Sequence, residues 1–241
     1  MIELACHDGY FGRIEILERQ RDGARLYRVG DGIQTMARPD GESLFGYVHA
    51  LKKLCRESQT ILLIGGAGGS LATMLARRGR SVVVVDIDPA ARVLAERYFS
   101  LDPHVEWITA DAHTLVNEWE RRFDTVVVDA CDAYGTVGAF LDATWLAETM
   151  NSIEPDGQLL LNLANSEDTG NSGFHVAQAI AAKGFRVALY FPEDGCEGNE
   201  LMRISRTERP RALDLGDLKR RPRETHTYLV SLRSYDATPS R

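Results

Sequence analysis

The chain has 241 residues, which suits one ordinary domain or one domain with a small appendage. Its 26% charged and 44% apolar residues are typical of a soluble globular protein. No apolar run approaches the ~20 residues that span a bilayer. The formal charge of −7 is expected to repel nucleic acid and to favour cationic small molecules weakly. We therefore expect neither a nucleic-acid partner nor a membrane partner.

The N-terminus lacks the basic start and long apolar stretch of a secretory signal, which predicts a cytoplasmic protein. The cysteines are widely spaced and form no C-x-x-C pair: Cys6, Cys55, Cys131 and Cys196. This spacing argues against a disulfide framework and against a thiolate zinc site, so no metal is expected.

The first forty residues alternate apolar and polar positions around Asp22-Gly23. This pattern predicts a β-hairpin followed by a short strand from Ile33. Apolar residues at helical spacing then predict a helix over Ser43–Leu54, with Ser43 as its N-cap. We expect residues 1–42 to form a small antiparallel β-domain and residues 43–241 to form the main domain.

From Thr60 the pattern changes to short continuous apolar runs, which predict strands covered on both faces, as in a parallel sheet. These runs are Ile61–Ile64, Val82–Val85, Val105–Ile108, Thr125–Val128 and Leu159–Leu163. Helical patterns alternate with them at Ser70–Arg78, Pro89–Phe99, Leu115–Arg121, Ala139–Ser152 and Phe174–Lys183. Two last strands are predicted at Arg186–Phe191 and Glu200–Ser205.

Four glycines follow the first of these strands, in Gly65-Gly-Ala-Gly-Gly69. Glycines at such a point let the backbone pass close under a nucleotide and turn into a helix. Close packing alone would also explain them, and a dinucleotide enzyme uses the same device. Gly65, Gly66 and Gly68 are the candidate contacts to a cofactor.

Acidic residues end the next two strands. Asp86 comes about twenty residues after the glycines, where a carboxylate can accept both hydroxyl hydrogens of a ribose. The nearby Asp88 suits the N-cap of the helix that starts at Pro89. Asp111 ends the third strand, where it is equally suited to accept from an adenine amino group or to cap the following helix.

The fourth strand ends in Asp129-Ala-Cys-Asp132, over the crevice where open α/β sheets bind ligands. Two acids there suit the capture of a cationic amine and the removal of its proton. The alternative is that both carboxylates bind backbone amides of the next turn. Asp129 and Asp132 are the candidate catalytic residues.

Taken in order, these features resemble the polyamine aminopropyltransferases, the spermidine synthase family. Asp31-Gly-Ile-Gln-Thr35 resembles the family's D-G-x-x-Q element, which implies that Gln34 lies beside the nucleoside. Asp86 and Asp111 match its ribose and adenine acids, and Asp129 with Asp132 matches its catalytic and amine-binding pair. The resemblance implies a Rossmann-like, class I methyltransferase sheet with a small N-terminal antiparallel β-domain. It also implies a homodimer with a small-molecule amine as acceptor.

The chain departs from the family pattern at three places. The family's G-G-G-D-G-G loop is one residue shorter here, and it lacks the aspartate that holds the aminopropyl amine. Of the tyrosine-histidine-glutamate element only Tyr47 is kept, as a candidate substrate-binding residue, and Ala133 replaces a proline. The chain thus resembles divergent spermidine synthase-like proteins.

The resemblance predicts aminopropyl transfer from decarboxylated S-adenosylmethionine, with Asp129 as general base and Asp132 anchoring an ammonium. Methyl transfer from S-adenosylmethionine is the alternative, because a loop without an acid does not repel the donor's carboxylate. A nucleoside-binding protein without turnover is a third hypothesis. Dehydrogenase activity is the weakest, because the order of acids fits a single nucleoside better.

Overall fold

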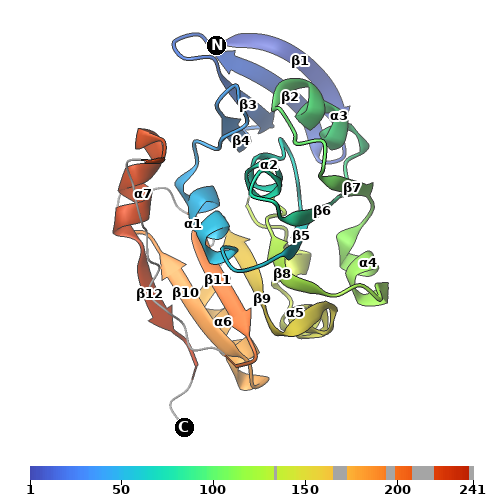
Figure 1. The fold of residues 1–241 in the computed structure, drawn as a ribbon, viewed down its shortest axis with the longest axis vertical. Coiled ribbons are helices and arrows are strands. Elements are labelled where there is room, and N and C mark those ends of the chain that lie inside the picture. Colours follow the sequence, from blue (N-terminus) through green and yellow to red (C-terminus); the bar gives the residue numbers. More distant parts are fainter. Residues whose placement is uncertain (133–134, 165–172, 194–198, 208–219, 239–241) are drawn as a thin grey trace.

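A computed structural model gives the fold of the chain and describes residues 1–132, 135–164, 173–193, 199–207 and 220–238. A small antiparallel sheet stands at one end of a larger α/β body (Figure 1). The expected class I methyltransferase-like sheet with an N-terminal antiparallel sheet is confirmed.

The small sheet has four strands in the order β1-β2-β3-β4. Their bounds are Ile2–Gly9, Gly12–Arg19, Ala24–Val29 and Gly32–Ala37. The hairpin and the strand near Ile33 are present, but the sequence did not reveal β1. All residues of β1 are exposed or half-buried, so this edge strand lacks the alternation that marks a strand with one buried face.

The predicted helix after this sheet begins later than expected, and Ser43 is not its N-cap. Helix α1 spans Gly46–Leu54, and its N-cap position is Phe45. Ser43 instead pairs with Ala37 in an isolated β-bridge, and its hydroxyl accepts a hydrogen bond from the Phe45 amide at 3.1 Å. The chain therefore stays extended past Ser43. The boundary between residues 42 and 43 remains a prediction.

The large sheet has the order β12-β10-β11-β9-β8-β5-β6-β7. Strands β7, β6, β5, β8 and β9 run parallel, and the other three extend the sheet antiparallel. The parallel strands are β5 Thr60–Ile64, β6 Ser81–Asp86, β7 Glu106–Thr109, β8 Phe123–Val128 and β9 Ile153–Leu163. The others are β10 Arg186–Phe191, β11 Glu200–Ser205 and β12 Arg233–Asp236.

Helices cover both faces of this sheet, as the continuous apolar strands predict. The remaining α-helices are α2 Ser70–Ala76, α3 Pro89–Tyr98, α4 Ala112–Glu118, α5 Ala143–Thr149, α6 Gly173–Ala182 and α7 His226–Ser231. One core lies on the face of α1, α2, α3 and α7, and another on the face of α4, α5 and α6. None of the helices in the described ranges is long and apolar enough to cross a membrane.

Two helices differ from their predicted extents because an aspartate caps each of them. Helix α4 starts at Ala112, since the Asp111 carboxylate accepts from the His113 amide at 2.9 Å. The single helix expected over Ala139–Ser152 is interrupted at Asp142, whose carboxylate caps α5 at the amides of Thr144 and Trp145. Such capping satisfies amides that have no partner within the helix.

Candidate active site

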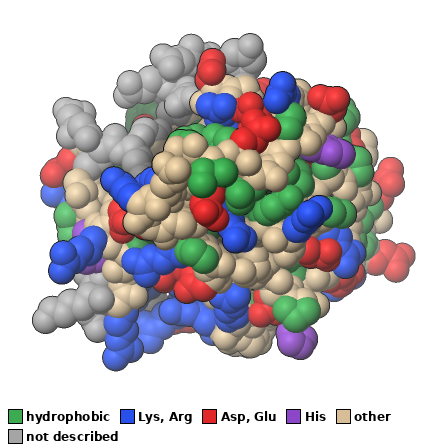
Figure 2. All heavy atoms as spheres, turned by 90° about the horizontal axis from the view of Figure 1, so that it is seen from above, with side chains coloured by type: hydrophobic (Ala, Val, Ile, Leu, Met, Phe, Trp, Pro, Cys, Tyr) green, Lys and Arg blue, Asp and Glu red, His purple; other side chains and the backbone are tan. Residues whose placement is uncertain are grey.

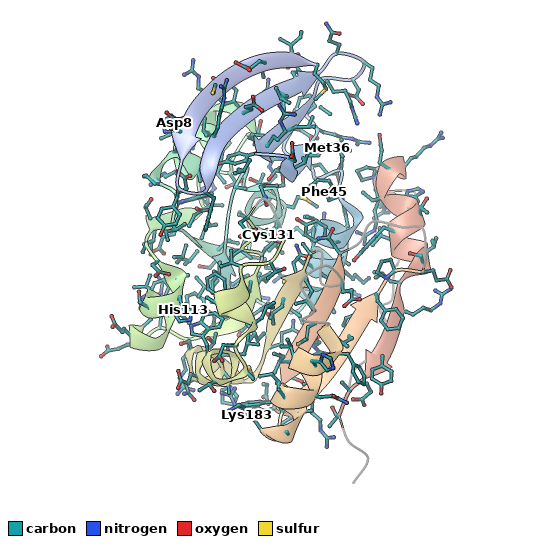
Figure 3. The ribbon with its side chains drawn as sticks, turned by 180° about the vertical axis from the view of Figure 1, so that it is seen from behind. Asp8, Met36, Phe45, His113, Cys131 and Lys183 are labelled. Carbon is teal, nitrogen blue, oxygen red and sulfur yellow. The ribbon has the colours of Figure 1, made fainter. Side chains whose placement is uncertain are left out.

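A pocket of about 400 Å³ lies at the carboxyl ends of β5, β6, β7 and β8, beneath the small sheet. Seen from behind, Cys131 lies between His113 on one side and Phe45 on the other, with Asp8 of the small sheet above (Figure 3). His113, Cys131 and Phe45 all line the pocket, which therefore runs across the ends of the parallel strands. This is where open α/β sheets bind ligands.

The glycine turn after β5 forms one wall of the pocket. Gly65 has φ +88°, and a Cβ there would lie 2.5 Å from the main-chain oxygen of Asp129. A Cβ on Gly66 would lie 2.3 Å from the ring of Trp107. Close packing thus requires both glycines, and both also line the pocket. The predicted cofactor contact Gly68 does not line the pocket, and its amide donates to the Thr35 hydroxyl of the small sheet at 3.1 Å.

Asp86 lines the pocket and holds the glycine turn in place. Its Oδ2 accepts from the amides of Gly66 at 2.7 Å and Ala67 at 3.2 Å, while its Oδ1 accepts from Asp88 at 2.8 Å. An ionised carboxylate has about four acceptor positions, so three are already used. A ribose diol bound here would find one free acceptor position or displace an amide.

The far end of the pocket is built around α4 and has an aromatic wall. Asp111 lines it while capping α4, so the capping role is present and the adenine contact stays a prediction. The ring of His113 stacks on Trp145 with centroids 5.5 Å apart and lies 6.1 Å from Phe140. This end offers flat apolar surface beside a carboxylate, which is the chemistry that a purine base fits.

Asp129 follows β8 and lines the pocket beside Gly65. Its Oδ1 accepts from the Asn162 amide at 2.7 Å, and the Tyr47 hydroxyl also hydrogen-bonds to it. Burial raises the pKa of Asp129 to about 7, against the lowering effect of the bonds from Asn162 and Tyr47. The carboxyl group thus titrates near neutral pH, where a general base is most effective.

Asp132 is placed differently from Asp129 and does not line the pocket. Its Oδ1 accepts from the Gly135 amide at 3.1 Å, and its main-chain oxygen accepts from the Gln34 side chain at 2.8 Å. Gln34 lines the pocket while binding this segment to the small sheet. Of the predicted site residues, the pocket brings together Gln34, Tyr47, Gly65, Gly66, Asp86, Asp111 and Asp129.

Several residues that line the pocket or contact its lining residues were not found from the sequence. Asn162 orients Asp129, and its own side-chain oxygen accepts from Asn199 at 2.9 Å. Ser70 is buried at the start of α2, and its Oγ has no hydrogen-bond partner in the described part of the chain. Tyr10 and Phe11 form the turn between β1 and β2. No sequence pattern links these residues, because they come from three separate parts of the chain: the β1–β2 turn, the start of α2 and strand β9.

The pocket carries negative and aromatic groups. Its carboxylates are Asp86, Asp111 and Asp129, and among the described residues that line it there is no lysine or arginine. A cationic ligand would therefore gain Coulomb energy here, whereas a ligand carboxylate would find no basic side chain along the wall.

The sequence comparisons agree with this architecture. Residues 61–157 match the family model of a methyltransferase domain. The polyamine aminopropyltransferase 1 of Streptomyces coelicolor is 26% identical over 139 residues, which cover 53% of this chain and 26% of that protein. The mitochondrial ubiquinone biosynthesis O-methyltransferase of Schizosaccharomyces pombe is 32% identical over 108 residues, covering 45% of this chain and 39% of the relative. The matches thus span well under half the length of either relative.

The structural comparison extends over almost the whole chain. A probable spermidine synthase from Corynebacterium glutamicum superposes with a TM-score of 0.78 at 17% identity, covering 97% of this chain and 90% of that one. At this identity the likeness establishes the fold. The expected resemblance is confirmed: the chain is similar in sequence to the polyamine aminopropyltransferases, has the spermidine synthase fold and contains a methyltransferase-type domain. These relatives are transferases.

Proposed function

We propose that this protein transfers an aminopropyl group from decarboxylated S-adenosylmethionine to a small amine. The observation that carries the proposal is Asp129, a carboxyl group with a pKa of about 7 in the wall of an acid-lined pocket. An amine acceptor is mostly protonated at neutral pH and has no free lone pair. A neighbouring carboxyl group that is partly ionised at neutral pH can take up the proton that the acceptor must lose.

The reaction follows from the order of groups along the pocket. The adenosyl part lies towards Asp86 and Asp111, and the sulfonium lies over the ends of β5 and β8. The acceptor nitrogen loses its proton to Asp129 and attacks the donor carbon next to sulfur. The carbon–sulfur bond breaks, its electrons remain on sulfur, and methylthioadenosine leaves as a neutral thioether. The protein contributes alignment and proton removal.

Charge favours the decarboxylated donor over S-adenosylmethionine. The decarboxylated form carries a sulfonium and an ammonium, and both are attracted by the pocket carboxylates. S-adenosylmethionine adds a carboxylate, and desolvating it without a basic partner costs several kcal/mol by typical estimates for buried ions. Asp132, three residues after Asp129, is retained in this proposal as the anchor for a second ammonium.

Methyl transfer is the second candidate, and one feature favours it. The glycine turn lacks the aspartate that holds the aminopropyl amine in the spermidine synthase family, which this chain resembles. Ser70, with an uncharged hydroxyl, begins helix α2 there. The match to a methyltransferase domain model is consistent with this alternative.

Mass analysis of the products separates these functions. The protein is incubated with either donor and a panel of diamines, and both nucleoside and amine products are measured. We expect methylthioadenosine together with an amine that has gained an aminopropyl group, and only with the decarboxylated donor. An acceptor that gains a methyl group from S-adenosylmethionine would replace this proposal with methyl transfer. If both donors bind and neither is consumed, the protein binds the nucleoside without turnover.

A further inference from the structure

The β1–β2 turn carries two large aromatic side chains where small polar residues are usual. Gly9 pairs with Gly12 across the hairpin, so Tyr10 and Phe11 alone form its loop. Two-residue hairpin loops favour glycine, asparagine and aspartate. Here 62% of Tyr10 and 44% of Phe11 is exposed, and their rings form an edge-to-face pair with centroids 5.0 Å apart. Both residues line the pocket.

The turn is held at a fixed place above the end of β6. The Tyr10 amide donates to Asp88 Oδ2 at 2.8 Å, and Asp88 Oδ1 caps α3 at the Ala90 amide. The Asp88 amide in turn donates to Asp86, which holds the glycine turn. A Cβ on Gly9 would lie 2.4 Å from Asp88 Oδ2, so the hairpin approaches the body closely. Hydrogen bonds through Asp88 and Asp86 thus connect the β1–β2 turn to the glycine turn after β5.

This anchoring identifies which part of a ligand the rings would meet. Asp88 lies two residues after Asp86, at the end of β6, whereas Asp129 follows β8. Strand β5 lies between β6 and β8 in the sheet. The turn is therefore anchored on the β6 side of the pocket, where the nucleoside is proposed to bind, and the proposed base lies on the other side of β5. Figure 2 shows the molecule from above, with hydrophobic side chains among acidic and basic ones on the face it presents.

We infer that Tyr10 and Phe11 are nucleoside-binding residues that cover the adenosyl part of the ligand. Aromatic rings bind the faces of bases and sugars by stacking and by excluding water, without a requirement for charge. Nucleoside binding would also bury apolar ring surface that is otherwise exposed to water. The inference rests on the proposed function, because it takes an adenosyl compound as the occupant.

Binding of methylthioadenosine, measured by calorimetry, tests the inference. We expect Phe11→Ala to weaken its affinity about tenfold and the Tyr10→Ala, Phe11→Ala double variant to weaken it further, as stacking losses of this kind do. Phe11→Trp should restore most of the affinity. Tyr235→Ala is the matched control, since Tyr235 is 46% exposed and its ring pairs with Phe174 at 5.8 Å, but it does not line the pocket.

The outcomes separate this inference from the proposed function. If the unaltered protein does not bind methylthioadenosine, the adenosyl assignment itself is wrong. If it binds and Phe11→Ala binds equally well at an unchanged melting temperature, the nucleoside-binding role of the turn is wrong. A raised KM for the amine acceptor with unchanged nucleoside affinity would assign the rings to the acceptor and overturn the inference as well.

Discussion

Asp129→Asn is expected to reduce turnover by about 10²–10⁴-fold, the usual effect of losing a general base. Asparagine keeps the shape of the side chain and retains an oxygen that can accept from Asn162, but it cannot take up a proton. The pH dependence gives a second readout. The pKa of Asp129 is raised to about 7, so kcat/KM of the unaltered protein should fall below pH 7 as the carboxyl becomes protonated. This decrease should be absent from the variant.

Asp132→Asn is the comparison variant for this prediction. As the proposed anchor of an ammonium, Asp132 contributes to binding, so its replacement should chiefly raise the apparent KM for the amine. Because Asp129 and not Asp132 lines the pocket, the pH profile should stay intact. Parallel losses of activity and melting temperature in both variants would instead mean that the two acids serve only to bind neighbouring amides.

Gly65→Ala is expected to abolish ligand binding and to lower the melting temperature by several degrees. The substitution forces a Cβ to within 2.5 Å of the main-chain oxygen of Asp129, and backbone cannot move aside as a flexible side chain can. Overpacking of this kind typically costs ~1–3 kcal/mol, and φ +88° adds strain for any residue with a Cβ. The displaced strand end carries the proposed base.

Gly79→Ala provides a matched control for the strain alone. Gly79 has φ +74°, but a Cβ there would meet nothing within 4 Å. Its variant should lose a little stability and keep full affinity for methylthioadenosine. Equal effects of the two substitutions on melting temperature and affinity would show that close approach at Gly65 does not matter to the site.

The positions of the parallel strands along the chain could be predicted from the sequence because they depend on local patterns. Continuous apolar runs such as Val82–Val85 identify buried parallel strands wherever they occur. Strands β1 and β12 were missed because they lack such a pattern. All four residues of β12 are exposed and every residue of β1 is exposed or half-buried, so neither shows the periodicity that burial imposes. Helix α7, which is partly buried but only six residues long, was missed as well.

Site residues could be predicted where they end a strand, but not where they depend on contacts between residues far apart in the sequence. Asp86, Asp111 and Asp129 were located because the carboxyl ends of parallel strands share one edge. The same reasoning could not show that Asp86 already accepts hydrogen bonds from three amides, or that Asp132 does not line the pocket. The contact between Tyr10 and Asp88 joins residues 78 positions apart, and no local pattern predicts it.

Calorimetric titration with methylthioadenosine, S-adenosylmethionine and its decarboxylated form tests the central claim most directly. The account predicts saturable one-site binding of methylthioadenosine and tighter binding of the decarboxylated donor than of S-adenosylmethionine, since three carboxylates and no described lysine or arginine line the pocket. Absence of saturable binding by all three compounds would contradict the adenosyl site. Tighter binding of S-adenosylmethionine would contradict the choice of donor and favour methyl transfer.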